Sequence, residues 1–262
     1  MKFLISNDDG FEAPGLAALY AALRPHGSVT VVAPNVCHSS KGHAVDTKQP
    51  IRVERRVVPP FGEISVVHSS PADCIRVGLR HVMCEAPDFV IAGINPGANL
   101  GVDLYYSGTA AAAREAALLG IPAIALSRYL HPDFPVDWRI LSEHCSRVLA
   151  RLCSAEFALP RGHFWNVNFP AVRNEKYPEE ILIVPHGTEP HAVAFTVLES
   201  SPEAELVTYS GVYRERGRSD QCDVRHLFEQ RLTATPIGPQ STAFTGFQPF
   251  SRVSLVDADI PD

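Results

Sequence analysis

Apolar and polar positions alternate in blocks over the first two-thirds of the chain. Short, continuous apolar runs have the length of buried strands. They lie at 2–6, 28–34, 63–67, 88–94, 122–127 and 164–170. Between them, apolar residues recur at helical spacing in stretches that begin at Pro14, Pro71 and Ser107. The stretch that begins at Pro71 runs to about Cys84. A fourth stretch, 137–153, is amphipathic. The pattern therefore predicts strands and helices in alternation.

Uninterrupted apolar strands separated by helices are typical of a parallel sheet covered on both faces. We therefore predict a doubly wound α/β fold with a mostly parallel sheet and one domain, whose core spans 1–170. The segment 171–235 holds few apolar residues for a core of its own. Its runs at 191–199 and 205–213 predict a β-hairpin excursion, followed by a polar loop at 214–223. Residues 236–262 form a C-terminal tail or arm.

Composition narrows the class of protein. Of the 262 residues, 45% are hydrophobic and 20% charged, as in ordinary globular proteins. No apolar run reaches the ~18–20 residues of a membrane helix, and the start of the chain lacks a signal-peptide pattern, so we expect a cytoplasmic protein that binds no membrane. The net charge of −6 disfavours a nucleic-acid polymer as partner. Six scattered cysteines without a C-x-x-C pair indicate reduced thiols.

Three polar clusters follow predicted strands. They are Asn7-Asp8-Asp9-Gly10, the stretch 35–42 and Asn95-Pro96-Gly97-Ala98-Asn99. Ligands of open parallel sheets bind beyond the carboxyl ends of the strands. The convergence of three clusters at that edge predicts a binding site there.

Asp8 and Asp9 allow two interpretations. Neighbouring carboxylates repel each other, so they form either a solvated turn or part of a cation site. The other clusters favour the cation site, because Ser39 or Ser40 supplies a hydroxyl and Asn95 or Asn99 an amide oxygen. Such an oxygen-only set suits one Mg²⁺, Mn²⁺ or Ca²⁺ ion and does not suit zinc.

The helix that starts at Ser107-Gly108-Thr109 offers unpaired N–H groups to an anion. An ordinary Ser or Thr cap is the alternative interpretation. Because this helix follows the loop that carries Asn95 and Asn99, we expect its N-terminus to bind phosphate in the same site. His38 and His43 flank the second cluster and could serve a leaving group, but we expect them to lie at the surface or, like Asn7, to support the ligating residues.

Several longer blocks together resemble the SurE family of nucleotidases, in family order over residues 1–170. They are SNDDGFEAPGLAAL, VVAPN with HSSKGH, SPADC, AGINPGANLG, YSGTAAAAREAALLGIPAIALS and NVNFP. The resemblance implies a divalent-metal-dependent phosphomonoesterase for nucleoside 5′-monophosphates, and sometimes for 3′-monophosphates or polyphosphate. By position it places the metal ligands at Asp8, Asp9, Ser39 and Asn95. It also implies a β-hairpin and an exchanging C-terminal segment in homodimers or homotetramers.

The chain departs from the family pattern at Asn35, Ser69 and Ala92, and EQRLTATPI (229–237) echoes the family only weakly. These departures bear on substrate preference and on the C-terminal arrangement. We predict in-line hydrolysis of a phosphate monoester with metal assistance, with Asp8 and Asp9 as catalytic residues. Whether Asp8 or a water attacks phosphorus stays open. The alternative function is a non-catalytic phosphate or nucleotide sensor on the same fold. A receiver domain does not fit, because the third predicted strand ends without an acid.

Overall fold

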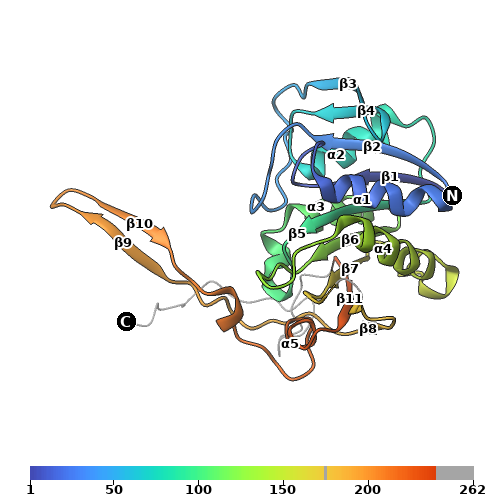
Figure 1. Ribbon diagram of the computed structural model, residues 1–262. Helices are drawn as coiled ribbons and strands as arrows, with labels where there is room; N and C mark the ends of the chain where they lie inside the picture. The colour runs from blue at the N-terminus through green and yellow to red at the C-terminus, as the bar shows by residue number, and fades with distance from the viewer. Residues whose placement is uncertain (174–175, 240–262) are drawn as a thin grey trace, which may run out of the picture.

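A nine-stranded sheet runs through the middle of the molecule (Figure 1), in a computed structural model that describes residues 1–173 and 176–239. Its strands are β1 (Lys2–Ser6), β2 (Ser28–Pro34), β3 (Val53–Val58), β4 (Gly62–Val67), β5 (Phe89–Pro96), β6 (Ala123–Arg128), β7 (Phe164–Phe169), β8 (Ile181–Ile183) and β11 (Leu232–Ile237). Their spatial order is β3-β4-β2-β1-β5-β6-β7-β11-β8. From β4 to β7 all neighbours are parallel, whereas β3 and β11 run antiparallel to β4 and β7. The predicted doubly wound, mostly parallel sheet is confirmed.

Helices cover both faces of this sheet. They are α1 (Pro14–Leu23), α2 (Pro71–Val77), α3 (Gly108–Leu118) and α4 (Trp138–Leu152), with the short α5 (Asp223–Phe228) near the β11 edge. Helices α1 and α4 pack together on one face, and α2 and α3 on the other, which gives two apolar layers. Because both faces are covered, β1 is buried from Phe3 to Ser6, as its continuous apolar run predicts.

The order of the strands reverses between β1 and β5. From β1 the chain winds outward through β2 to β4, and it then returns to start the second half with β5 on the other side of β1. Such a switch point leaves a crevice at the carboxyl ends of the two strands. The clusters that contain Asp8 and Asn95 follow these two strands.

The segment after β7 differs in part from the prediction. The predicted hairpin forms as β9 (Phe195–Ser200) and β10 (Glu205–Tyr209), and it projects from the body (Figure 1). However, β8 and β11 join the main sheet, and Val224 and Leu227 pack against Leu100. The few apolar residues of 171–235 thus extend the existing core instead of forming a new one. Of the tail 236–262, residues 240–262 lie outside the described residues.

The helix predicted from Pro71 to about Cys84 is also shorter. Helix α2 ends at Val77, and the chain continues as one π-helical turn over Gly78–Val82. Gly78 lies so close to β1 that a Cβ atom there would stand 2.8 Å from a methyl carbon of Leu4. Close packing on the sheet thus coincides with the change of helical geometry.

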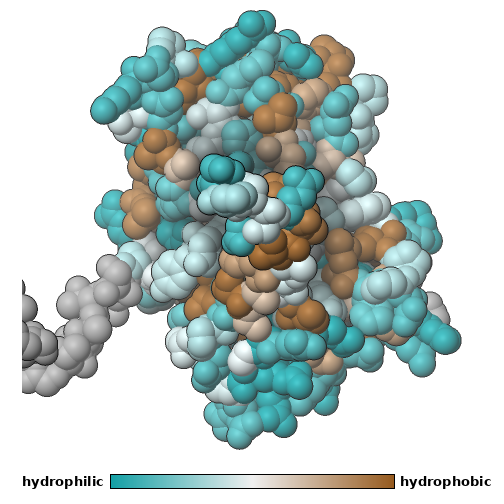
Figure 2. Space-filling view, turned by 90° about the vertical axis from the view of Figure 1, so that its left-hand side faces the viewer, coloured by the Kyte–Doolittle hydropathy of each residue, from teal (hydrophilic) through white to brown (hydrophobic). Residues whose placement is uncertain are grey.

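The hairpin exposes a row of apolar side chains. Phe195, Val197, Leu198, Leu206, Val207 and Tyr209 are each about half exposed or more. In the view turned toward the hairpin, hydrophobic atoms gather near the middle of the face (Figure 2). Within the described ranges, no helix combines the length and the hydropathy needed to cross a membrane.

Candidate active site

A cleft of about 260 Å³ lies at the carboxyl ends of β1 and β5. Its lining residues are Asp8, Ser39, Ser40, Asn95, Pro96, Ala98, Asn99, Asp103, Tyr106, Ser107 and Tyr213. All three polar clusters named from the sequence contribute residues to this wall, although Asp9 is not among them. The fold therefore brings them to one place, as the strand-end rule predicts.

Asp8 is held between β1 and the N-terminus of α3. Its side chain is buried, and the Thr109 hydroxyl donates a hydrogen bond to Asp8 Oδ1 at 2.6 Å. Gly108 packs directly on it, since a Cβ atom at that position would lie 2.7 Å from Asp8 Cβ. Gly10, with φ of 106°, lets the chain turn after the two acids. Burial raises the pKa of Asp8, and the hydrogen bond from Thr109 opposes that rise.

Asp9 lies beside Asp8 and is half-buried. Burial raises the pKa of Asp9 to about 7, and the negative charge of Asp8 adds to this rise. Within the described residues, Asp9 Oδ2 and Asn7 Oδ1 are buried without a hydrogen-bond partner. Asn7 donates its amide N–H to the Gly10 carbonyl at 2.8 Å. Two acids and unpartnered oxygens thus share one poorly compensated site.

The neutral ligand candidates come from the other two clusters. Ser39 and Ser40 both line the cleft and are exposed. Asn95 donates its amide N–H to the Gly97 carbonyl at 2.7 Å, which leaves the amide oxygen for a ligand. A register shift in the pairing of β5 with β6, between Ala92 and Asn95, occurs where the strand reaches the cleft.

The N-terminus of α3 is both a cap and part of the cleft. Ser107 Oγ accepts the Ala110 N–H at 3.0 Å, so its side chain is the helix N-cap. The Thr109 hydroxyl is used by Asp8. Asn99 donates to Ser127 Oγ at 2.8 Å, and its backbone N–H donates to Asn168 at 2.9 Å. The side chains of Ser107, Thr109 and Asn99 therefore order the site, and backbone N–H groups at the helix start are what α3 offers to an anion.

The two histidines lie in different surroundings. His38 stands next to the acids: its backbone N–H donates to the Asp8 carbonyl at 2.7 Å, and its Nε2 is buried without a partner among the described residues. Burial lowers the pKa of His38, although the charge of Asp8 opposes this. His43 is not in the cleft wall. It pairs with Glu115 of α3 at 2.8 Å.

The three departures from the family pattern have local contacts or burial of their own. The backbone N–H of Asn35 donates to the Val67 carbonyl at 3.0 Å. Ser69 donates to Asp73 at 2.6 Å, next to the start of α2. Ala92 is fully buried within β5. None of the three is among the residues that line the cleft.

Sequence reasoning missed Asp103, Tyr106 and Tyr213. The first two lie in the stretch that joins the Asn95–Asn99 loop to α3, so their place in the chain was a usable signal. Tyr213 follows the hairpin, and its hydroxyl donates to Asp103 Oδ2 at 2.7 Å across 110 residues of sequence. Nothing local in the sequence indicates that contact.

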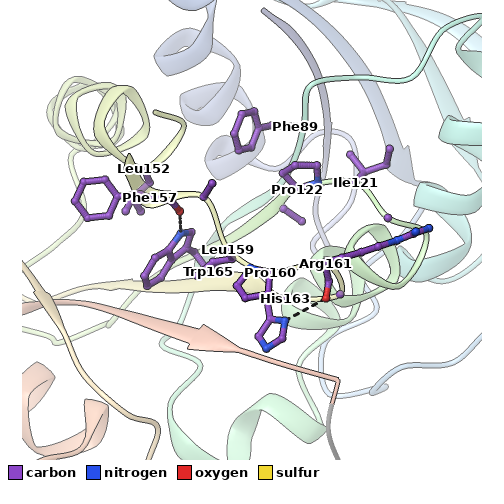
Figure 3. A pocket seen from close by; sticks show the side chains of 14 residues that line it. Phe89, Ile121, Pro122, Leu152, Phe157, Leu159, Pro160, Arg161, His163 and Trp165 are labelled. Carbon is purple, nitrogen blue, oxygen red and sulfur yellow. Dashed lines mark hydrogen bonds between the residues drawn. The ribbon is translucent and has the colours of Figure 1, made fainter. Parts of the chain in front are cut away.

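Two larger cavities elsewhere have different chemistry. One, of about 410 Å³, lies at the amino ends of β5, β6 and β7, where Phe157, Leu159 and Trp165 make a mostly apolar wall (Figure 3). The Trp165 indole donates to the Phe157 carbonyl at 3.0 Å, so its polar atom is already satisfied. The other, of about 560 Å³, lies between α4 and β8. Neither gathers acids and neutral oxygens as the smaller cleft does.

Taken together, the fold and the cleft define a doubly wound α/β protein with an acidic, oxygen-lined site at its topological switch point. The family model of survival protein SurE matches residues 3–189. The chain belongs to the SurE family.

Individual relatives agree with this assignment. A Synechocystis protein is 40% identical over 237 residues, which are 90% of this chain and 99% of the relative. The 5′-nucleotidase SurE of Paramagnetospirillum magneticum is 36% identical, over 90% of this chain and 89% of its own length. The crystal structure of the SurE protein from Aquifex aeolicus superposes with a TM-score of 0.77 at 28% identity, covering 92% of this chain and 95% of that one.

Proposed function

We propose that this protein is a 5′-nucleotidase, a phosphomonoesterase that depends on a divalent metal and hydrolyses nucleoside 5′-monophosphates. Membership of the SurE family and the curated relatives named 5′-nucleotidase SurE support the phosphomonoesterase activity. The metal dependence rests on the chemistry of the cleft.

The observation that carries the proposal is the charge of the cleft wall. Its described lining residues include the carboxylates of Asp8 and Asp103 and no Lys, Arg or His, and Asp103 is already paired with Arg216, so the uncompensated acid is Asp8. A phosphate monoester carries close to two negative charges at neutral pH. It would meet a buried carboxylate without compensation. A cation between Asp8 and the phosphate removes this conflict.

The residues present fit such a cation. Asp8 and Asp9 resist carrying two negative charges side by side, and Asp9 Oδ2 is buried without a partner within the described residues. Within 1–173 and 176–239, no group of three His, Cys, Asp or Glu side chains is placed so that it could hold a metal ion by itself, so Ser39 and Asn95 would complete the set with neutral oxygens. All four ligands are hard oxygen donors, which suits Mg²⁺ or Mn²⁺, with Ca²⁺ as a further option. When bound, the ion would polarise the phosphoryl group and stabilise negative charge.

The chain itself would bind and orient the phosphoryl group. The backbone N–H groups of the first turn of α3 and the positive end of its dipole attract the phosphoryl oxygens. Gly108 keeps this helix end close to Asp8. Asn99, locked by Ser127 and Asn168, holds the facing loop in place. Attack on phosphorus in line with the leaving oxygen then comes from a water or from Asp8.

Finer features of the function are also proposals. The family resemblance supports activity toward 3′-monophosphates and polyphosphate as well. The exposed apolar hairpin supports a homodimer or homotetramer, since unpaired strand edges associate readily. The cytoplasmic location expected from the sequence stays a prediction.

Release of phosphate from a panel of substrates tests the function. The panel holds nucleoside 5′- and 3′-monophosphates, polyphosphate and a generic aryl phosphate, each with Mg²⁺, with Mn²⁺ or with a chelator. We expect turnover of 5′-monophosphates that stops with chelator and returns with metal. Nucleotide binding without release of phosphate, in every metal, would instead identify the non-catalytic sensor. Turnover that the chelator leaves unchanged would contradict the metal dependence.

A further inference from the structure

The cleft is chemically divided into two ends. At one end are the acids and the N-terminus of α3, where a phosphoryl group and a cation fit. At the other end Asp103, Tyr106 and Tyr213 form the wall. A phosphoryl group fills only the first end, so the second is available to the rest of the ester.

The charge at the second end is neutralised. Arg216, which is buried, donates two hydrogen bonds to Asp103, at 2.5 and 2.6 Å. His191 adds a contact to Asp103 at 3.2 Å, and the Tyr213 hydroxyl donates to it at 2.7 Å. Asp103 therefore has its charge and its acceptor positions occupied, unlike the acids at the phosphoryl end. A neutral, partly apolar leaving group fits here better than a charged one.

Tyr106 is the open aromatic surface of this end. Its side chain is 58% exposed although it lines the cleft. It immediately precedes Ser107, the N-cap of α3, so it lies one residue from the proposed phosphoryl site. The ring of Tyr213 is more occupied: it stacks on Tyr129 with centroids 6.1 Å apart, and the Arg216 guanidinium lies 4.4 Å from its centroid. The Tyr106 ring meets the His191 ring at a tilt, with centroids 5.8 Å apart, but Tyr106 is more exposed than Tyr213, which makes a fixed wall.

We propose that Tyr106 stacks on the base of the nucleotide, with Tyr213 as the opposing boundary of a nucleoside subsite. This inference rests on the proposed nucleotidase function and names the residue that reads the nucleoside. Stacking on an aromatic ring tolerates every base, because each base has a π-face. The segments on both sides of the hairpin contact Asp103 at this end of the cleft. The contacts come from His191 before β9 and from Tyr213 and Arg216 after β10.

Paired tyrosine variants test the subsite. Tyr105 is the matched control, because it is 69% exposed, adjacent in sequence and absent from the cleft wall. For Tyr106→Ala we expect the ratio of kcat/KM for adenosine 5′-monophosphate to kcat/KM for glycerol 2-phosphate to fall by about tenfold, as for loss of a base-stacking ring. The fall should lie mainly in a raised KM for the nucleotide. Tyr105→Ala and Tyr106→Phe should keep the wild-type ratio.

Binding of adenosine, which carries no phosphate, separates this proposal from the proposed activity. We expect calorimetry to show that the wild-type protein and Tyr105→Ala bind adenosine about tenfold more tightly than Tyr106→Ala does. This difference in affinity should appear whether or not any ester is hydrolysed. Absence of phosphatase activity with this binding difference intact would overturn the nucleotidase and keep the subsite. Equal adenosine affinity in all three proteins, or an unchanged ratio in Tyr106→Ala, would overturn the subsite. A Tyr106→Phe variant that behaves like Tyr106→Ala would overturn stacking as its cause.

Discussion

At the scale of single residues, the site depends on a small number of close contacts around Asp8. The carboxylate is buried, receives the Thr109 hydroxyl and lies against Gly108. Its neighbour Asp9 has a pKa raised to about 7 by burial and by the charge of Asp8. The local arrangement is therefore unfavourable by itself, and the proposed cation would make it favourable.

Replacement of Asp8 by Asn tests this directly. The variant keeps the shape and removes one of two repelling charges, so its melting temperature without metal should equal or exceed that of the wild type. Added Mg²⁺ or Mn²⁺ should raise the melting temperature of the wild type more than that of Asp8→Asn. Turnover should fall at least ~10²-fold. An active variant with the wild-type response to metal would exclude this metal site.

The Thr109 hydroxyl can be removed with little change of shape. In Thr109→Val the buried Asp8 loses its side-chain donor, which we expect to lower the free energy of unfolding by about 1–3 kcal/mol. Thr109→Ser keeps the hydroxyl and is the control, with a smaller loss. Urea unfolding of both variants, at one pH and one metal concentration, measures the difference. If Thr109→Val unfolds like the wild type, the contact with Asp8 contributes nothing.

At the scale of elements, the end of α5 places a residue with a side chain, Gln230, in an unfavourable backbone conformation. The helix closes with the Gln230 N–H on the Leu227 carbonyl at 2.9 Å and the Arg231 N–H on the His226 carbonyl at 3.0 Å, the pattern of a Schellman motif. This motif places the residue after the cap in the left-handed region, and Gln230 has φ of 64°. Glycine adopts that conformation without a Cβ penalty.

We therefore expect Gln230→Gly to stabilise the protein. Gln230 is exposed, so its side chain contributes little packing. The relieved left-handed strain exceeds the added chain entropy of Gly, so the gain should be about 0.5–1 kcal/mol in the free energy of unfolding, which a shift of the denaturation midpoint measures. Gln230→Ala keeps a Cβ atom in the same conformation and should give no such gain. A stabilisation by Ala as large as that by Gly would show that the backbone conformation is not the cause.

At the scale of the whole molecule, the hairpin is the feature that a single chain leaves unexplained. Its strands β9 and β10 form a separate sheet whose side chains are exposed throughout. Aromatic and aliphatic residues so far from the body gain nothing from burial in this chain. Contact with a second copy of the chain would bury these side chains.

The mass in solution tests this assembly. The protomer has a mass of 28.6 kDa, and we expect light scattering at micromolar concentration to give a multiple of it. Val197 and Val207 stand opposite each other in the hairpin, so Val197→Lys with Val207→Glu removes apolar surface and keeps an attractive cross-strand pair. This double variant should shift the equilibrium toward the monomer. A wild-type protein that is monomeric throughout the concentration range would contradict the assembly.

Much of the fold could be predicted from local pattern. Continuous apolar runs identified six of the parallel strands, because strands buried on both faces have no polar alternation. Strand β3, with Arg55 and Arg56 exposed at the edge of the sheet, has no such run and was missed. The short β8 and the strand β11 were missed for a related reason, since they derive their pairing from β7 and from each other. The edge strands β3 and β8, and β11 between β7 and β8, depend on neighbours that local sequence does not reveal.

The sequence by itself determined which chemistry is available: adjacent acids at the end of a strand, hydroxyl and amide oxygens after two others, and a helix with a free N-terminus. The periodicity of the chain was enough to predict that these groups lie at one edge of a sheet, because the carboxyl ends of parallel strands lie at the same edge. Only the tertiary structure decided how each group is used. In the folded chain Thr109 donates to Asp8, Ser107 caps α3, and His43 pairs with Glu115. Tyr213 and Arg216 bind Asp103, from which they are more than a hundred residues away in sequence. Hydrogen-bond partners and burial are properties of the packed chain, and they assign roles that composition and spacing leave open.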